Sequence, residues 1–417
     1  MGRRYTELVD QFLSQLKNYF SKETTLTAFT DEKSYGMELQ KQRLSKNGLR
    51  LESKFEQNTA FVDDSHIHEW TDGKYTGVTN VRYLHWEDTI YKGDAKIYHK
   101  KQNSMVYGSV IDAQKPLGTY INDTYACPNC GTPSKVGELK NGCSYCGTHF
   151  ELTELFPKIS NFYFVRNPNP LGSIRNKLLF MALPIAAAAG FLVFAISKNP
   201  SIGKGIGGIL QLLFAFVFAM FYLFLHLGLL FVIGWVIFSL IASKTNFKMV
   251  KAIWKSSKRF ENAMKKYSSE FSYDYFSTRI ASIVEMILFS DNPDDLPIYC
   301  GEPLNHKFDD IVYSRYMGAV DVVHFNVVED YCNIQADVYM TNYHYDGNKI
   351  KRSDDVIAVK LSRNIKKDID LNFSIKAIQC PNCGGNFDAS KHAICPYCET
   401  KFDIRDEDWF VTAIKKR

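Results

Sequence analysis

Polar and apolar residues alternate along residues 332–341, which is the period of a strand with one buried face and one wet face. A turn is predicted at Asp346 and Gly347, and residues 356–361 predict a further strand. Apolar residues at helical spacing precede these strands over residues 276–288. A helix followed by antiparallel strands predicts an α+β domain in the C-terminal half.

The N-terminal part shows a similar order. Apolar positions at helical spacing over residues 8–20 predict an opening helix. The strand-like runs that follow it are residues 78–91, 95–99 and 105–111. A cluster of four cysteines follows the strands in each half. Because the order of helix, strands and cysteine cluster occurs twice, the sequence predicts a diverged internal duplication.

Between the two parts, residues 178–243 carry two charges in 66 positions. The first block, residues 178–196, is long enough to cross ~30 Å of hydrocarbon. The second, residues 209–242, has room for one tilted helix or for two spans. Basic residues flank the apolar segment on both sides, and basic flanks favour the cytoplasmic side of a membrane. Both flanks can be cytoplasmic only if the number of spans is even. We therefore predict a transmembrane helical hairpin in the inner (plasma) membrane, with both soluble parts in the cytoplasm.

Residues 244–267, after the apolar block, predict a basic amphipathic helix. Its apolar face carries Trp254 and Phe260, residue types that settle at a membrane interface. We expect it to lie on an anionic lipid surface, which attracts each nearby cation by about 1 kcal/mol. The alternative is a free helical stalk, in which Phe247, Ile253 and Trp254 pack on the extension of the second span or on the domain. The cations expected at the lipid surface are Lys248, Lys251, Lys255, Lys258 and Arg259.

Eight of the ten cysteines form four Cys-x-x-Cys pairs, which combine into two sets. Twelve residues separate the pairs of the first set, and eleven separate those of the second. Thiolates at this spacing close a tetrahedral four-cysteine zinc site, a zinc ribbon. The alternative, two sets of disulfides, is disfavoured because no cleavable signal peptide opens the chain. We predict two zinc ions per chain, held by Cys127, Cys130, Cys143, Cys146, Cys380, Cys383, Cys395 and Cys398.

Composition and motifs argue against several other classes of protein, namely disordered chains, nucleic-acid binders and enzymes. Charged residues make up 23% and hydrophobic residues 46%, which rules out wholesale disorder. A net charge of +5 disfavours a strongly cationic nucleic-acid binder. We do not expect an enzyme, because four-cysteine sites are closed to substrate and no phosphate loop, nucleophile elbow or His-Glu metal helix occurs. His66, His68 and Glu69 form a loose ligand-like cluster that is better interpreted as a solvated loop.

A run of motifs in residues 265–417 resembles bacterial members of the Tim-forty-four-like family. These motifs are Phe271-Ser-Tyr-Asp-Tyr-Phe, the apolar helix, the alternating strands, Cys380-Pro-Asn-Cys-Gly with Cys395-Pro-Tyr-Cys, and Asp408-Trp-Phe-Val. The resemblance implies a cone-like α+β domain, a curved antiparallel sheet over helices. Mitochondrial relatives bind the inner-membrane surface and organise chaperone or translation partners during protein import. This chain differs in its predicted hairpin, its two ribbons and its lack of a presequence, so the architecture carries over better than the import role.

Together these features predict a membrane-anchored zinc-ribbon scaffold or adaptor with a protein partner, in protein transport or membrane-protein assembly. One alternative is a nucleic-acid-binding zinc-ribbon protein, which the ordinary mixture of acidic and basic residues in both ribbons disfavours. Another is a cone domain that holds a small ligand or peptide in its sheet concavity, among the strand tyrosines Tyr313, Tyr316, Tyr339 and Tyr343.

The predicted fold class is α+β, with a transmembrane helical hairpin between two soluble modules that each end in a four-cysteine ribbon. The predicted segments are an N-terminal α+β region at 1–124, ribbon 1 at 125–157, the hairpin at 178–243, the basic helix at 244–267, the Tim-forty-four-like domain at 268–375, and ribbon 2 at 376–417.

Overall fold

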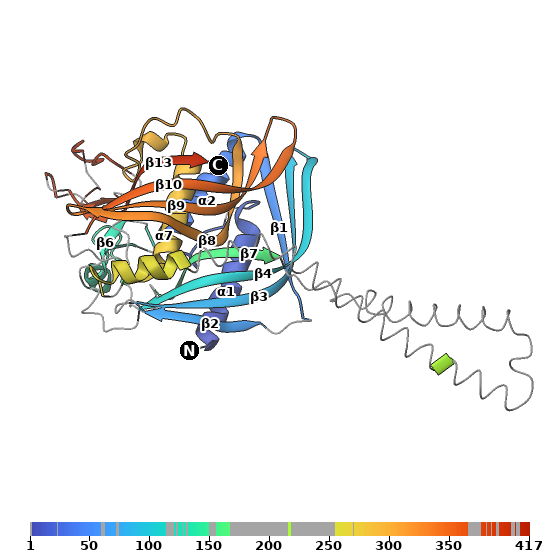
Figure 1. Ribbon diagram of the computed structural model, residues 1–417. Helices are drawn as coiled ribbons and strands as arrows, with labels where there is room; N and C mark the ends of the chain where they lie inside the picture. Colours follow the sequence, from blue (N-terminus) through green and yellow to red (C-terminus); the bar gives the residue numbers. More distant parts are fainter. Residues whose placement is uncertain are drawn as a thin grey trace, which may run out of the picture. The chain divides into compact units, whose positions relative to one another are not determined.

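The computed structural model (Figure 1) divides the chain into two compact units, one of Met1–Asn167 with Ile253–Arg417 and one of Pro168–Ala252. In the second unit only Phe216 and Val217 are described, as helix. The structure describes residues 2–22, 24–59, 63–71, 75–113, 121, 124–127, 129–130, 132–149, 156–166, 216–217, 255–269, 271–365, 377–380, 382–384, 386–388, 392–401, 405 and 409–417.

The N-terminal half of the first unit is two helices and a five-stranded antiparallel sheet. Its strands run in the order β1-β3-β4-β7, with β2 also paired to β3. Its elements are α1 (Gly2–Tyr19), α2 (Asp31–Lys46), β1 (Leu49–Gln57), β2 (Asp64–Thr71), β3 (Tyr75–Lys92), β4 (Ala95–Ala113) and β7 (Lys158–Arg166). Between β4 and β7 the chain forms ribbon 1, with β5 (Thr124–Ala126), β6 (Pro133–Lys135) and α3 (Val136–Asn141).

The C-terminal half repeats this plan with a four-stranded antiparallel sheet in the order β13-β10-β9-β8. Its elements are a helix over residues 255–264, α7 (Tyr273–Phe289), the 3-10 turn η2 (Pro293–Asp295), β8 (Ile311–Val328), β9 (Tyr331–Tyr345), β10 (Ile350–Asn364) and β13 (Phe410–Lys416). Between β10 and β13 the chain forms ribbon 2, with β11 (Ala377–Gln379) and β12 (Asn386–Asp388).

Fine details of the backbone repeat as well. A bulge interrupts the returning strand at the same place in each half, at Ser160 of β7 and Thr412 of β13. Each hydroxyl donates to a carbonyl of the neighbouring strand, Ser160 to Ser109 at 3.1 Å and Thr412 to Lys360 at 3.4 Å. Because bulges are specific features rather than defects, their recurrence supports one ancestral module used twice.

A second repeated detail is a short parallel bridge from a loop to the returning strand. Phe29 bridges Ile159 in the first half, and Tyr299 bridges Val411 in the second. The N–H of Ile159 donates to Ala28 at 2.8 Å, and that of Val411 donates to Ile298 at 2.7 Å. The repetition of topology, bulge and bridge is what the predicted internal duplication requires.

The helix α7 is buried on nearly all sides, with 14 of its 17 residues in the core. Ser272 begins it, because its side-chain oxygen accepts a hydrogen bond from the N–H of Tyr275 at 3.3 Å. Asp274 in the first turn suits the positive end of the helix dipole. The helix contacts α2 and β7 of one half and β8 and β9 of its own half, so it lies between the two.

The two halves share a hydrophobic core. One cluster of buried residues joins α1, α2 and the N-terminal sheet to Val312, Tyr313 and Tyr343 of the C-terminal sheet. The rings of Tyr98 and Tyr343 meet edge to face with centroids 5.4 Å apart. At Gly318, where φ is +78°, an added Cβ would lie 2.5 Å from the ring of Tyr163 on β7. The sheets therefore pack closely at the junction of β7 and β8.

A buried ion pair joins α2 to α7. Lys33 donates to both carboxylate oxygens of Glu285 at 2.7 Å, and both side chains are almost completely buried. Gly36, one turn along α2, allows the approach, since a Cβ there would lie 3.3 Å from the Glu285 carboxylate. Both charges have lost their water, so removal of one partner would leave the other charge buried and uncompensated and would lower the stability of the fold.

A second buried ion pair joins the two sheets. Arg315 on β8 donates to the carboxylate of Asp88 on β3, which also accepts from Ser53 at 2.6 Å and from Trp86 at 2.8 Å. The guanidinium lies over the Trp86 ring at 3.9 Å and over Phe164 at 4.4 Å. Hydrogen bonds and aromatic faces thus replace the water that both charges lose.

The predicted fold class is wrong in two respects. Among the described residues, no helix combines the length and apolar character that a membrane span requires. The most apolar long helix, α7, has 17 residues, and the protein core buries its apolar surface. The described residues therefore contain no span of the predicted hairpin, on which the multi-pass inner-membrane location rested. Residues 178–243 themselves lie outside the described residues, apart from Phe216 and Val217.

The second correction concerns the two separate modules. The residues before 168 and after 252 form one compact unit, joined by a common core and by two buried ion pairs. The sequence predicted the repeated order of elements but not that the repeats pack on each other, because the contacts that join them lie more than 200 residues apart.

We predict that Lys33→Met lowers the free energy of unfolding by about 3–5 kcal/mol, because it leaves the Glu285 carboxylate buried without its partner. The double variant Lys33→Met with Glu285→Met is expected to recover most of this loss. Urea unfolding followed by circular dichroism measures both. The control is Lys265→Met, which breaks the exposed Glu261 pair and should cost about 0.5 kcal/mol or less. Equal losses for the two single variants would contradict the prediction.

Candidate metal centre

Each ribbon gathers four cysteines around one point. In ribbon 1, Sγ of Cys127 lies 3.6 Å from that of Cys146, and Sγ of Cys130 lies 3.8 Å from that of Cys143. All four sulfurs lie within 4.8 Å of one another. Four sulfurs at 2.3 Å around a tetrahedral metal stand about 3.8 Å apart, whereas a disulfide bond is about 2.05 Å long. The spacing fits a metal and excludes disulfides within this cluster.

Ribbon 2 repeats the arrangement. Sγ of Cys380 lies 3.5 Å from that of Cys398, and Sγ of Cys383 lies 3.7 Å from that of Cys395. These four sulfurs also lie within 4.8 Å of one another. The predicted ligand sets are therefore brought together, and each forms a group that can hold a metal ion.

The backbone of the knuckles explains why these short segments converge. The N–H of Cys143 donates to the carbonyl of Thr148, and the N–H of Cys395 donates to that of Thr400, both at 2.9 Å. The residue after the last cysteine has positive φ in each ribbon, +71° at Gly147 and +59° at Glu399. Glycine adopts this conformation without strain, whereas Glu399 adopts it at a cost that the surrounding turn offsets.

A threonine and an asparagine support the last cysteine of ribbon 1. The Thr148 hydroxyl lies 3.3 Å from Sγ of Cys146, and Asn129 donates to that hydroxyl at 2.9 Å. Contacts with the Thr148 side chain and backbone lower the pKa of Cys146 to about 6. The thiolate, the form that binds metal, is therefore favoured at neutral pH.

The same support is present in ribbon 2. The Thr400 hydroxyl lies 3.2 Å from Sγ of Cys398, and Asn382 donates to the hydroxyl at 3.0 Å. The pKa of Cys398 is lowered to about 6 by its contacts with the Thr400 side chain and backbone. These four residues were not predicted from the sequence, although the repeated Cys-x-x-Cys-x-Thr spacing signals the threonines in both ribbons.

Burial has the opposite effect on the first cysteine of ribbon 1, because it raises the pKa of Cys127 to about 12. Four thiolates so close together also repel one another. A bound cation removes both costs, so the donor set fits a metal that prefers thiolate.

Ribbon 1 rests on the body through a small apolar cluster. Val136 and Leu139 of α3 are buried with Cys127 and Cys143, against Tyr275 of α7 and other residues. The metal site is thus anchored to the first turn of the central helix.

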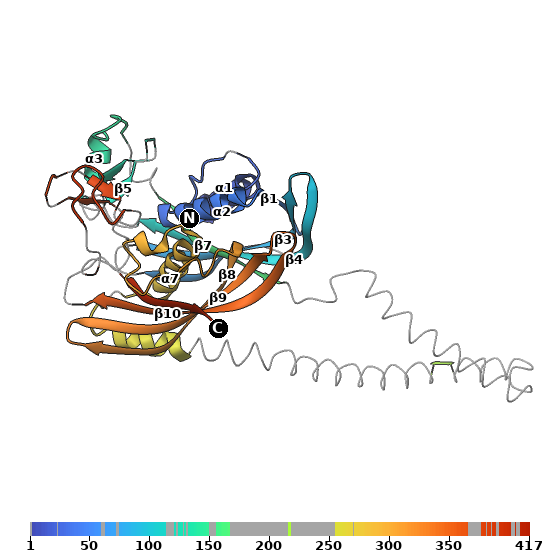
Figure 2. The ribbon, with the colours of Figure 1, turned by 90° about the horizontal axis from the view of Figure 1, so that it is seen from above.

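The two ribbons lie side by side (Figure 2). Strand β5 of ribbon 1 contacts β11 of ribbon 2, and β6 contacts β12. First strand meets first strand and second meets second, the pattern of a self-complementary contact between equivalent surfaces. The repeated arrangement therefore places two candidate metal sites at one end of the unit.

The residues predicted at a lipid surface have other surroundings where they are described. Lys255 and Lys258 are exposed on the helix over residues 255–264. Arg259 donates to the carbonyl of Val322 at 3.2 Å. Phe260, expected to face lipid, is fully buried in the C-terminal core. Lys248, Lys251 and Trp254 lie outside the described residues.

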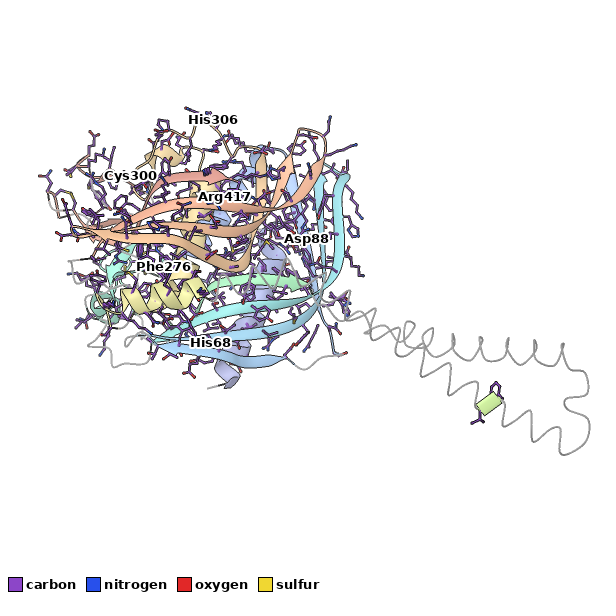
Figure 3. The ribbon with its side chains drawn as sticks, viewed as in Figure 1. His68, Asp88, Phe276, Cys300, His306 and Arg417 are labelled. Carbon is purple, nitrogen blue, oxygen red and sulfur yellow. The ribbon has the colours of Figure 1, made fainter. Side chains whose placement is uncertain are left out.

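Within the part of the chain that the structure describes, the remaining candidates are not gathered into a second metal-binding group. His68 is exposed and its Nε2 lies 3.3 Å from the Asp274 carboxylate (Figure 3), while the side chain of His66 lies outside the described residues. Tyr313 and Tyr316 are buried beside a cavity of about 10 Å³, which has room for about one water molecule.

No family model, no curated protein and no solved structure matches this chain. The resemblance of residues 265–417 to the Tim-forty-four-like family therefore stays a prediction.

We predict two metal ions per chain in the purified protein. Cys380→Ser should lower the content to one, because it removes one ligand of ribbon 2 and leaves ribbon 1 complete. Inductively coupled plasma mass spectrometry against protein concentration measures the ratio. Wild-type protein with fewer than two metal ions after purification without chelator would contradict the prediction.

We predict that Thr148→Val weakens metal binding at ribbon 1 by about 10- to 100-fold, because it removes the hydroxyl beside the Cys146 thiolate. Competition with a chromogenic chelator measures the two affinities. Thr400→Val should weaken only ribbon 2, which makes the two variants controls for each other. Unchanged affinity in both variants would show that the hydroxyls do not support the thiolates.

Proposed function

We propose that this protein is a zinc-dependent scaffold that presents two paired ribbons to a protein partner. The observation that carries the proposal is the contact between two equivalent four-cysteine ribbons at one end of a duplicated body. Nothing in this arrangement requires chemistry at the metal.

Zinc is the metal that suits these sites best. Four thiolates at tetrahedral spacing are soft ligands, which select zinc or iron–sulfur chemistry over magnesium or calcium. Paired Cys-x-x-Cys knuckles with a closed coordination sphere are typical of structural zinc. A closed site has no position for substrate, so the metal's role is to fold the ribbons and fix their surfaces.

Exposed aromatic residues support a protein partner. Within the described residues, the two most exposed large hydrophobic side chains are Tyr145 and Tyr397, at 79% and 68%. They occupy the same position in the second knuckle of each ribbon, between the last two cysteines. Tyrosine is enriched in protein interfaces because it offers a large contact area at low entropic cost.

The resemblance to the Tim-forty-four-like family agrees with such a role, since that family organises protein partners during transport. An adaptor in protein transport is therefore the class of function that we favour for this scaffold.

The test is affinity capture of the tagged full-length chain after mild cross-linking, with quantitative mass spectrometry. We expect a set of proteins that wild type retains and that a Cys380→Ser, Cys395→Ser variant loses, because ribbon 2 folds only with its metal. Tyr267→Ala is the matched control, an exposed tyrosine outside the ribbons. Identical protein sets for all three chains, or material that disappears on nuclease treatment, would overturn the proposal.

A further inference from the structure

A cleft of about 260 Å³ lies among three elements of the first unit. The end of β2 contributes Trp70 and Thr71, and the end of the helix over residues 255–264 contributes Glu261 and Lys265. Asp274, in the first turn of α7, also lines the cleft. Its volume is near the lower end of the range for small-molecule sites, so it has room for a small ligand.

The indole of Trp70 has a fixed place on the sheet. Trp70 is paired in register with Gly77 of β3, and a Cβ on Gly77 would lie 1.9 Å from the indole ring. Only glycine leaves room for the indole there, and glycine inside a strand marks a close approach of this kind. The ring of Tyr275 meets the indole edge to face with centroids 6.0 Å apart. The cleft therefore has one aromatic wall that its neighbours hold in position.

Polar groups of both signs line the same cleft. Glu261 pairs with Lys265 at 2.7 Å, and the Asp274 carboxylate lies 3.3 Å from Nε2 of His68. A carboxylate accepts about four hydrogen bonds, so each one retains acceptor capacity beyond these contacts. Three hydroxyl-bearing residues also line the cleft, Thr71, Ser269 and Ser272. The cleft thus offers donors and acceptors beside an aromatic wall.

These groups select a ligand by its chemistry. The indole favours a flat apolar face, because it offers a large apolar contact area. The polar groups favour hydroxyls around that face, since a hydroxyl donates to a carboxylate and accepts from the Lys265 ammonium. A sugar ring combines both features, with C–H groups on one face and hydroxyls around its edge.

We infer that this cleft binds a monosaccharide unit, with its C–H face on Trp70 and its hydroxyls on Asp274 and Glu261. The inference goes beyond the scaffold function and does not depend on it, because the residues that line the cleft belong to neither ribbon.

Charged ligands fit the cleft less well. An ammonium compound is attracted by the indole and the carboxylates, but the ammonium of Lys265 already lies 2.7 Å from Glu261 and repels it. An anion is attracted by Lys265 but repelled by the carboxylates of Glu261 and Asp274. A neutral ring with hydroxyls meets neither repulsion.

The test is fluorine NMR of the zinc-loaded full-length chain labelled with fluorotryptophan. The chain has five tryptophans, and the Trp70 signal is the one that Trp70→Phe removes. The probes are methyl α-glucoside, methyl β-galactoside, methyl α-mannoside and N-acetylglucosamine. We expect at least one of them to shift the Trp70 signal and not the others, with a Kd of about 1 mM because the ligand has few atoms.

The variants address the contacts one at a time. Asp274→Asn and Glu261→Gln keep the side-chain shapes and remove the charged acceptors, so each should weaken sugar binding about tenfold. Trp70→Ala should weaken it at least as much, measured by saturation transfer to the sugar. Glu302→Gln is the matched control, since it changes an exposed carboxylate outside the cleft and should bind as wild type does. Circular dichroism checks the fold of each variant. If Trp70→Ala does not fold, the two carboxylate variants decide the question.

Two further probes separate the classes of ligand. Tetrahydropyran is the sugar ring without hydroxyls, and choline is a small quaternary ammonium compound. We expect neither to shift the Trp70 signal at concentrations where the sugar does, since one lacks the hydroxyls and the other meets Lys265.

Three results would overturn the inference. The first is no shift of the Trp70 signal by any of the sugars up to about 50 mM. The second is binding of choline or tetrahydropyran that is as tight as that of the best sugar. The third is equal sugar affinity of Asp274→Asn, Glu261→Gln and Glu302→Gln. The capture experiment on the ribbons is unaffected by any of these results, so failure of the sugar site and failure of the scaffold function are distinguishable.

Discussion

The buried ion pairs between the two halves are the interactions on which the arrangement depends. Lys33 with Glu285, and Arg315 with Asp88, place four charges where water cannot reach them. Each charge is compensated only if its partner from the other half stands at hydrogen-bonding distance. If one half were displaced relative to the other, these four charges would be buried without their partners. The two ion pairs therefore favour one arrangement of the halves over others that bury similar apolar area.

That placement decides what the ribbons can do. Each ribbon is inserted between the last two strands of its own sheet, so its position follows the position of its half. When the halves dock, the ribbons meet through equivalent strands. Two small metal-dependent units, each too small to bury much apolar area alone, thereby form a larger surface. In this view the body is a support that holds the pair of ribbons in register.

The predicted duplication would give such a surface with little new sequence. The bulges at Ser160 and Thr412 and the threonines at Thr148 and Thr400 recur because each stabilises its own local backbone or thiolate. The residues of the two interhalf ion pairs do not need to recur. Lys33 and Glu285 lie at different positions of the two repeats, and so do Asp88 and Arg315. Divergence could therefore concentrate at the interface while the ribbons stayed alike, which fits a function that uses both ribbons together.

The sequence by itself determined the features whose physics is local. Four cysteines at knuckle spacing define a metal site wherever the chain places them, alternation defines the strand over residues 332–341, and Ser272 begins α7 through a contact three residues away. Tertiary structure decided the rest. Lys33 and Arg315 look like surface charges, yet their partners lie 252 and 227 residues distant and bury them. Phe260 looks suited to lipid, yet it completes a protein core. An apolar pattern records that a face is covered but not what covers it, because burial in another part of the fold and burial in lipid select the same residues.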